Sequence, residues 1–504
     1  MNKKHLAAAA LLSLGCSAHA GGLLTNTNTN IAFNRNFARD GVIAIDGVYS
    51  NPAGVAFLPK GLHLSLNVQN AYQTRTIQSG MSVPGLENTP FHNPFKLNGG
   101  DAAGVKEFVG KAVAPVIPSV QAALNYDKWG FQAAFAVNGG GGKAVFNSGL
   151  GSFERSVAML PLLLNQKGLA SATPAYKLDS YISGQQYVFG VQLGATYKIN
   201  EHMAVYGGMR VNYLTNKYEG SITNLTANIA GQDQNLYEYF STQGDALREK
   251  AATYGAQAAA VQDPAVKAQL AGAAAQYDAA AKQMEDTKPL VADRYLECTQ
   301  TGWGVTPIVG FDYKAGKWNF GTRLELNTHV NLQNDTKRDD TGMFQNGVNT
   351  PSDLPGLWTV GAQYEALPNL RVMAGYHYFF DKSAKMADDK QKLLDGNTQE
   401  ILAGAEWDIT DAITVSAGGQ RTMYGLGDGS YLSDMSFVTS SYSVGFGAKV
   451  KVMRNASLNI AYFWTSYEDF DKAYTSEIQS VKVANTDRFT RTNKVLGVGL
   501  DIDF

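Results

Sequence analysis

The chain has 504 residues, with 42 Lys and Arg against 44 Asp and Glu, and a mean hydropathy of −0.19. This balanced charge gives no indication of a nucleic-acid-binding surface. After the N-terminal leader the sequence has no apolar run of about 18 residues, so it predicts no transmembrane helix. Glycine (52) and tyrosine (25) are frequent, whereas proline (15) and cysteine (2) are scarce. The composition favours many strands joined by tight turns.

Residues 1–20 have the pattern of a secretory signal peptide. Two lysines precede the apolar stretch Leu6–Leu14, and Ala18-His19-Ala20 supplies the small residues of a cleavage site. Lipidation at Cys16 is the alternative, but the residues before that cysteine fit a lipoprotein motif poorly. Cleavage after residue 20 leaves Cys298 as the single thiol, so no disulfide is expected within the mature chain.

The stretch Gly41–Pro59 is apolar but irregular. Glycines and prolines interrupt it, and Asn51-Pro52 is a pair that starts turns. Pro52 lacks an N–H and pushes Asn51 out of the helical region. Because the apolar side chains still need burial, two interpretations remain: a buried turn before the first strand, or a plug that enters a barrel.

Alternation of apolar and polar residues begins at residue 61 and recurs along the chain. Fourteen segments show it, and their lengths suit tilted membrane strands of about 9–11 residues. They lie near residues 61–75, 117–126, 131–138, 187–199, 204–216, 301–313, 318–328, 356–364, 371–381, 398–407, 413–421, 440–450, 457–467 and 492–504. We predict an all-β fold, a 14-stranded antiparallel transmembrane β-barrel.

The connections between these segments alternate between short and long, as in bacterial outer-membrane barrels. Short turns are expected at residues 127–130, 200–203, 314–317, 365–370, 408–412 and 451–456. The apolar face of the strand before each of the first five turns ends in an aromatic residue, which predicts an interfacial girdle. These residues are Tyr126, Tyr197, Tyr313, Tyr364 and Trp407.

Charged residues occupy the opposite faces of the strands. A lipid-facing position would cost about 2–4 kcal/mol for a basic residue at the midplane, so these side chains are expected in the lumen. They are Arg210, Arg323, Glu325, Glu400, Glu406, Asp501 and Asp503. There they can pair with Arg35, Arg39, Asp40 and Asp46 of a plug.

An Ala-rich segment at about 244–286 interrupts the barrel pattern. Asp263-Pro264 is an N-cap followed by proline at the first helical position, and it divides the segment into helices near 245–262 and 264–285. Each helix carries one apolar stripe. We expect a helical hairpin in an extracellular loop, and the alternative is a coiled interaction with another protein.

The sequence offers little for catalysis. Its histidines show no metal-ligand spacing, no Gly-x-Ser-x-Gly motif occurs, and no helix follows the four glycines at 139–142. We predict a protein that is not an enzyme and has no cofactor or metal.

Ser50-Asn51-Pro52-Ala53-Gly54 lies between the signal peptide and an alternating strand, and it resembles a motif of the FadL/TodX family of outer-membrane transporters for hydrophobic molecules. The resemblance implies that Asn51, Pro52, Ala53 and Gly54 close a hatch of residues 21–60 inside a barrel of residues 61–504. It also implies an inward kink of the third strand that opens the wall toward lipid. Gly139, Gly140, Gly141 and Gly142 fall in that strand, and the alternative there is a flexible strand end.

A loop after these glycines contains Leu160, Leu162, Leu163 and Leu164. An exposed apolar patch usually marks a binding surface, so these leucines are candidates for ligand capture, and the alternative is packing among the loops.

We interpret the chain as an outer-membrane transporter of a Gram-negative bacterium for passive uptake of long-chain fatty acids or similar hydrophobic compounds. The loops would capture the ligand, and a wall opening would release it sideways into outer-membrane lipid. A monomer that binds no nucleic acid is expected. The alternatives are a diffusion porin for polar solutes and an adhesive or structural barrel.

Overall fold

The computed structural model describes residues 16–17, 23–169 and 171–504. The predicted signal peptide lies outside the described residues, except for Cys16–Ser17, which form the short strand β1. This strand pairs with Gly141–Gly142 of the barrel wall.

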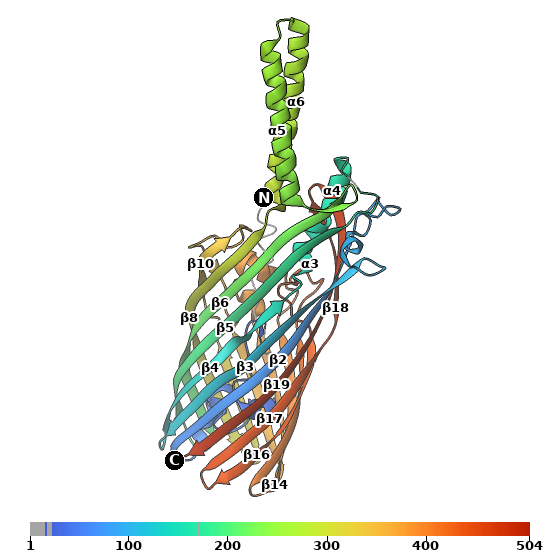
Figure 1. The fold of residues 1–504 in the computed structure, drawn as a ribbon. Helices are drawn as coiled ribbons and strands as arrows, with labels where there is room; N and C mark the ends of the chain where they lie inside the picture. The colour runs from blue at the N-terminus through green and yellow to red at the C-terminus, as the bar shows by residue number, and fades with distance from the viewer. Residues whose placement is uncertain (1–15, 18–22, 170) are drawn as a thin grey trace.

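Fourteen strands form one closed antiparallel barrel, which confirms the predicted fold class and strand number (Figure 1). The barrel closes where β19 pairs with β2, from Asp503↔His63 to Ala484↔Ser82. The wall strands in order are β2 (Gly61–Ser82), β3 (Val105–Asn125), β4 (Trp129–Phe146), β5 (Tyr176–Lys198), β6 (Met203–Ile229), β8 (Arg294–Ala315), β9 (Trp318–Glu325), β12 (Leu357–Leu367), β13 (Leu370–Phe379), β14 (Gln399–Thr410), β15 (Ile413–Met423), β16 (Ser441–Met453), β17 (Ala456–Tyr467) and β19 (Val481–Asp503).

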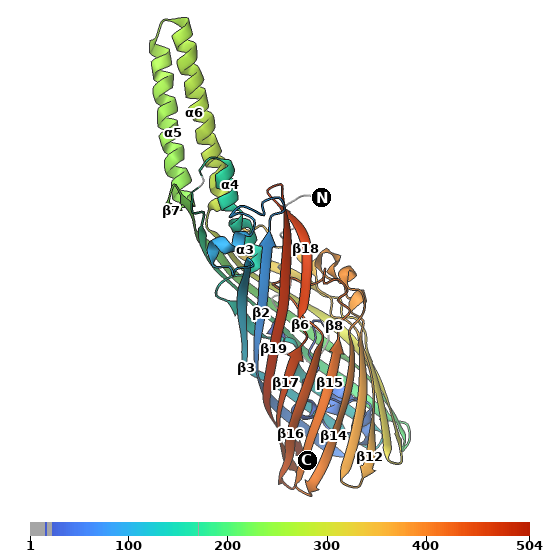
Figure 2. The same cartoon turned by 90° about the vertical axis from the view of Figure 1, so that its right-hand side faces the viewer.

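The wall is taller on one side than on the other (Figure 2). Strands β2, β3, β5, β6, β8 and β19 have 21 to 27 residues, whereas β9 and β12–β17 have 8 to 13. The sequence underestimates the long strands because their outer halves alternate among polar residues, without an apolar face. Short turns join the strands at the end of the barrel where the C-terminus lies (Figure 1).

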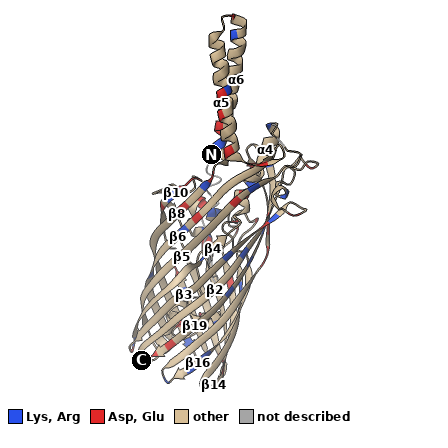
Figure 3. Cartoon of the chain, in the orientation of Figure 1, with Lys and Arg blue, Asp and Glu red and all other residues tan. Residues whose placement is uncertain are grey.

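The outer face of the wall is apolar and the lumen face is polar. Aromatic side chains pair across neighbouring strands near the short turns: Trp129 lies 4.8 Å from Tyr197 and Trp318 lies 4.4 Å from Tyr364, between ring centroids. Figure 3 shows long stretches of the wall strands without charge. An apolar band with aromatic residues near its edge is the exterior of an outer-membrane barrel.

The helical insertion is a hairpin that projects from the outer end of the barrel (Figures 1 and 2). Helix α5 (Leu236–Ala260) and helix α6 (Pro264–Val291) pack against each other, with Tyr254 stacked on Tyr277 at 5.4 Å. Asp263 caps α6 by accepting from the N–H groups of Ala265 and Val266. At about 1.5 Å per residue the hairpin is roughly 40 Å long. No described helix is long and apolar enough to cross a membrane.

Smaller elements occupy the N-terminal segment and the outer loops. The N-terminal segment has α1 (Ile31–Arg35), α2 (Gly47–Ser50) and η2 (Gly54–Phe57). The loops have η3 (Pro94–Asn98), α3 (Gly151–Ala158), α4 (Leu160–Gln166), β7 (Gln232–Asn235), β10 (Asn331–Asp339), β11 (Asn349–Pro351), η4 (Asp381–Ser383), η5 (Ala387–Leu393) and β18 (Phe470–Ile478).

Candidate functional site

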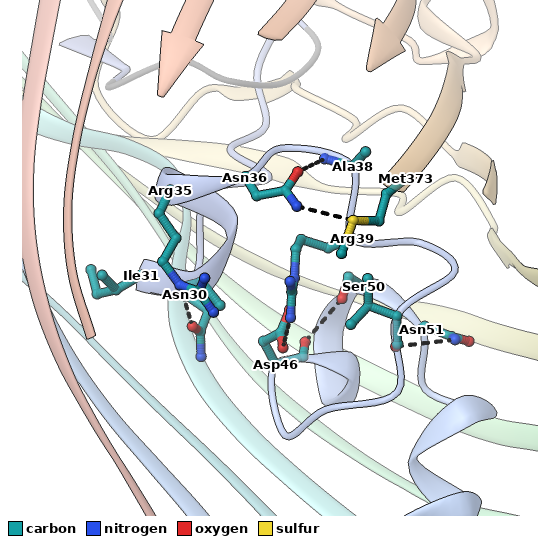
Figure 4. A network of polar contacts seen from close by, with 12 residues as sticks. Asn30, Ile31, Arg35, Asn36, Ala38, Arg39, Asp46, Ser50, Asn51 and Met373 are labelled. Atoms are coloured by element: carbon teal, nitrogen blue, oxygen red, sulfur yellow. Dashed lines mark hydrogen bonds and ion pairs between the residues drawn. The ribbon is translucent and has the colours of Figure 1, made fainter. Parts of the chain in front are cut away.

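The predicted hatch, described from Leu23 to Lys60, lies within the barrel and reaches strands on all sides of the wall (Figures 1 and 4). Gln69 of β2 donates to the carbonyl oxygen of Asn28 in the hatch at 2.6 Å, and Gln192 of β5 donates to the carbonyl oxygen of Val48 in the hatch at 2.8 Å. On the far side, the Phe37 ring lies 5.6 Å from that of Phe463 on β17. Contacts in so many directions fix the segment against the wall.

Asn51 joins the hatch to the wall. Its Nδ2 donates to the Asp312 carboxylate on β8 at 2.6 Å, while its Oδ1 accepts from the Gly54 N–H at 3.2 Å. Asp312 also accepts from Asn319 on β9 at 2.8 Å. A Cβ on Gly54 would overlap the Asn51 amide and the Asp312 carboxylate, so the turn needs glycine at this position.

Pro52 and Ala53 complete the motif. The Pro52 carbonyl oxygen accepts from Gln132 on β4 at 2.7 Å, and fully buried Ala53 packs with Tyr206 and Ile308. Together the four motif residues touch three wall strands, so they attach the hatch to the wall through both polar and apolar contacts.

A buried ion network holds the middle of the hatch. Arg39 binds both carboxylate oxygens of Asp46 at 2.8 Å (Figure 4). It also donates to Glu406 of β14 at 2.7 Å. Arg35 lies 2.9 Å from the same Glu406 oxygen. Burial lowers the pKa of the Arg39 guanidinium, but Asp46 and Glu406 more than offset this, so the pKa lies above its ordinary value. These contacts match the pairing expected from the sequence.

His377 forms a second link between hatch and wall. Its Nε2 lies 3.0 Å from Asp40 of the hatch, and its Nδ1 lies 2.8 Å from Glu400 of β14. Both nitrogens face carboxylates, so both contacts are satisfied only when the ring is protonated and donates twice. The sequence gives no signal for this link, because His377 and Asp40 are 337 positions apart.

The wall has a gap between β3 and β4. Pairing runs from Asn125↔Gly130 to Val120↔Phe135, stops, and resumes at Val113↔Lys143. At about 3.3 Å per residue and a tilt near 40°, the two edges lie roughly 13 and 30 Å above the β3–β4 turn, so the gap extends from the middle of an apolar band about 25 Å tall to its outer edge.

The four predicted glycines lie in β4 along this gap. Gly140 and Gly141 have φ of +70° and +125°, and bulges interrupt the β4–β5 register at Val137/Gly139 and Gly140/Gly142. A Cβ on Gly140 would overlap the Gln186 carbonyl of β5. The strand continues to Phe146, so the glycines form a kink within it and not its end.

Two prolines on β3 lie opposite this kink, and they were not among the predicted site residues. Pro115 and Pro118 have no N–H to donate to β4, and proline in the middle of a sheet strand is the signal that could have identified the second edge of the gap. On the lumen side, Asn26 of the hatch donates through Nδ2 to the Gly140 carbonyl at 2.9 Å, and its N–H donates to the Asn138 carbonyl at 2.7 Å.

The leucines predicted to form an exposed patch are mostly buried. Leu160, Leu162 and Leu164 are 8%, 6% and 4% exposed, and Leu163 is partly buried against the same apolar cluster. The expectation of an exposed loop is wrong because the segment is helix α4, whose apolar residues pack on loop residues such as Phe91. For these leucines to capture a ligand, α4 would have to move away from the loop residues that cover it.

Lys390 of η5 lies beside a small cavity lined by Leu24, Leu332, Met386 and Tyr431, among others. Its Nζ is shielded from solvent and has no hydrogen-bond partner among the described residues, although it lies 4.7 Å from the Tyr431 ring centroid. Burial lowers the pKa of Lys390 to about 8, and nearby Lys472 contributes to this shift. The cavity lining is mixed, because Gln300, Thr350 and Ser352 line it together with the apolar side chains and the one cation.

Among the described residues, no group of three His, Cys, Asp or Glu side chains is placed to hold a metal ion. Neither the family models nor the curated proteins gave a match to this chain.

Solved structures do match. A Pseudomonas aeruginosa FadL homologue is similar over 96% of this chain and 100% of its own, with 12% identity and a TM-score of 0.58. A mutant of the monoaromatic hydrocarbon channel TodX is similar over 94% of this chain and 99% of its own, with 12% identity and a TM-score of 0.50. At this identity the comparison establishes architecture: the chain has the fold of the FadL and TodX outer-membrane channels.

Proposed function

We propose that this protein is an outer-membrane transporter for the passive uptake of long-chain fatty acids or similar hydrophobic compounds. The outer loops receive the ligand, and the region around Leu24 of the hatch and Lys390 holds it. The β3–β4 gap then releases it sideways into the membrane. The similar solved structures include a monoaromatic hydrocarbon channel, which supports a hydrophobic ligand.

The interrupted β3–β4 pairing carries this proposal. In a membrane barrel the backbone N–H and C=O groups ordinarily form hydrogen bonds within the sheet. A break in that pairing within the apolar band is costly, which favours a functional role for it. Ile117 of β3 and Val137 of β4 border the break and belong to one apolar cluster with Phe37 of the hatch. An apolar passage suits a hydrophobic ligand better than a polar solute.

Lys390 favours an amphipathic acid over a plain hydrocarbon. A buried ammonium without a hydrogen-bond acceptor is costly, and a carboxylate would supply the missing partner.

The test is uptake of radiolabelled palmitate by cells that lack their own fatty-acid transporter. Expression of the full chain should restore uptake, whereas a variant lacking residues 21–46 should conduct ions in planar bilayers far better than the intact protein. If the intact protein conducts as freely as the deletion and takes up no palmitate, the chain is a diffusion porin.

A further inference from the structure

The outward face of the wall carries lysines directly above the gap. Lys143 of β4 pairs with Val113 of β3 in the first register position above the break, and Lys111 lies one outward position higher, opposite Val145. Lys111 is exposed, and the Lys143 side chain is 41% exposed. Both therefore lie on the lipid-facing side at the upper edge of the opening.

Charged side chains of both signs lie at this edge. Glu219 of β6 lies 2.9 Å from Lys143 and 2.6 Å from Lys217, so one carboxylate serves two ammonium groups. Lys111 has no ion-pair partner among the described side chains. On the neighbouring strands, Glu297 lies opposite Glu219 and 2.7 Å from Lys337, and Asp335 lies opposite Thr299, so Lys111 is the cation that has no nearby counter-charge at this edge within the described chain.

The lysines stand where the apolar exterior ends. Val113 and Val116, at the gap itself, are 48% and 63% exposed and face lipid. Lys143 lies beside Val113 and Lys111 lies one outward position above it, at the level from which long basic side chains extend to headgroups. Figure 3 shows Lys and Arg on the outer parts of these strands and few charges below them.

An acid that leaves through the gap meets two different environments. Its acyl chain can enter the hydrocarbon of the outer leaflet, but its carboxylate cannot follow without a large desolvation cost. The headgroup must therefore move upward to the interface while the chain passes sideways, and the first cations above the gap are Lys143 and Lys111.

We propose that Lys111 and Lys143 form an exit site that takes the carboxylate of the departing ligand. This inference rests on the proposed lateral release and adds the residues that receive the charged end. Lys143 is held by Glu219, whereas Lys111 is free to follow the headgroup. A neutral ligand of the same length would pass without using the site.

The experiment compares uptake of palmitate with uptake of hexadecanol in cells that express each variant at equal levels of folded barrel. A basic residue near a membrane interface contributes roughly a fivefold preference for an anion. Lys111→Gln should therefore lower palmitate uptake about fivefold, Lys111→Gln with Lys143→Gln should lower it further, and hexadecanol uptake should stay unchanged. Replacement of both lysines by arginine should keep palmitate uptake.

Lys494→Gln is the matched control, because Lys494 pairs with Tyr72 on β2, outside the gap. Unchanged palmitate uptake in the double glutamine variant would overturn the exit site alone. An equal loss for palmitate and hexadecanol would also overturn it, since the lysines would then only support the wall. If the unmodified protein takes up neither compound, the proposed function fails and the exit site with it.

Discussion

Replacement of Glu406 by glutamine should release the hatch without unfolding the barrel. Glu406 forms ion pairs with both Arg35 and Arg39, at 2.9 and 2.7 Å, and all three side chains are at least 92% buried. Glu406→Gln removes the negative charge and leaves two buried guanidinium groups with less compensation. Arg39 keeps Asp46, which lies in the hatch and moves with it.

The magnitude follows from the cost of breaking a buried ion pair, about 3–5 kcal/mol. Glutamine can still accept one hydrogen bond, so we expect the lower value. Since 1.4 kcal/mol corresponds to a factor of ten, about 3 kcal/mol raises the population of the open hatch roughly 150-fold. The barrel strands keep their own hydrogen bonds and should retain heat-stable mobility in gels.

Limited trypsin digestion measures this opening, because Arg35 and Arg39 are cleavage sites that are 3% and 2% exposed in the closed hatch. When the hatch closes faster than it is cut, the cleavage rate follows the open population. Asp408→Asn is the control, because Asp408 binds Arg371 on the wall and lies in the same strand as Glu406. Equal cleavage rates in Glu406→Gln and the unmodified protein would refute the view that this network holds the hatch.

Three further changes test other parts of the site. Asn51→Ala removes one hydrogen-bond donor from the Asp312 carboxylate, at a cost of about 1–3 kcal/mol. Trypsin should therefore cut the hatch faster than in the unmodified protein, but by a smaller factor than in Glu406→Gln. An unchanged cleavage rate would contradict the anchoring role of Asn51. Valine cannot keep the positive φ of the kink, so Gly140→Val with Gly141→Val should lower palmitate uptake. Gly207→Val is the control, because a side chain at that position meets open space and uptake should stay normal. Normal uptake in the double variant would mean that the kink is not the exit. Lys390 is protonated below its pKa of about 8, so the affinity for palmitate, measured by fluorescence competition, should fall as pH rises through 8. Lys390→Met should lose both the affinity and its pH dependence. An affinity that does not change with pH in the unmodified protein would exclude an ion pair with Lys390.

Local patterns in the sequence were sufficient to predict the wall. Alternation such as Leu62, Leu64 and Leu66 depends on neighbours two residues apart, so it predicts a strand and its lipid-facing side without knowledge of the partner strand. The site depends on residues far apart in the chain. Asn51 and Asp312 are 261 positions apart, and neither residue alone indicates the other.

The errors have similarly specific causes. Leu160, Leu163 and Leu164 have the three- and four-residue spacing of a helix, and this spacing, more than their apolarity, indicates that they pack inward as part of α4. The strand predicted near residues 117–126 contains Pro118 but not Pro115, so the prediction divides the second edge of the gap between strand and loop. Burial of Lys390 was beyond prediction, since it depends on Leu24 and Tyr431 from distant segments.

The length of β3 and β4 protects the protein from a hazard that the gap would otherwise create. Had the two strands separated permanently at Val120↔Phe135, the wall would end in two free sheet edges, and free edges recruit strands from other chains. Instead, four further pairs, from Val113↔Lys143 to Gly110↔Phe146, reunite the strands above the opening. The interruption is therefore bounded by paired strands above and below, and it leaves no free strand end that would favour aggregation edge to edge.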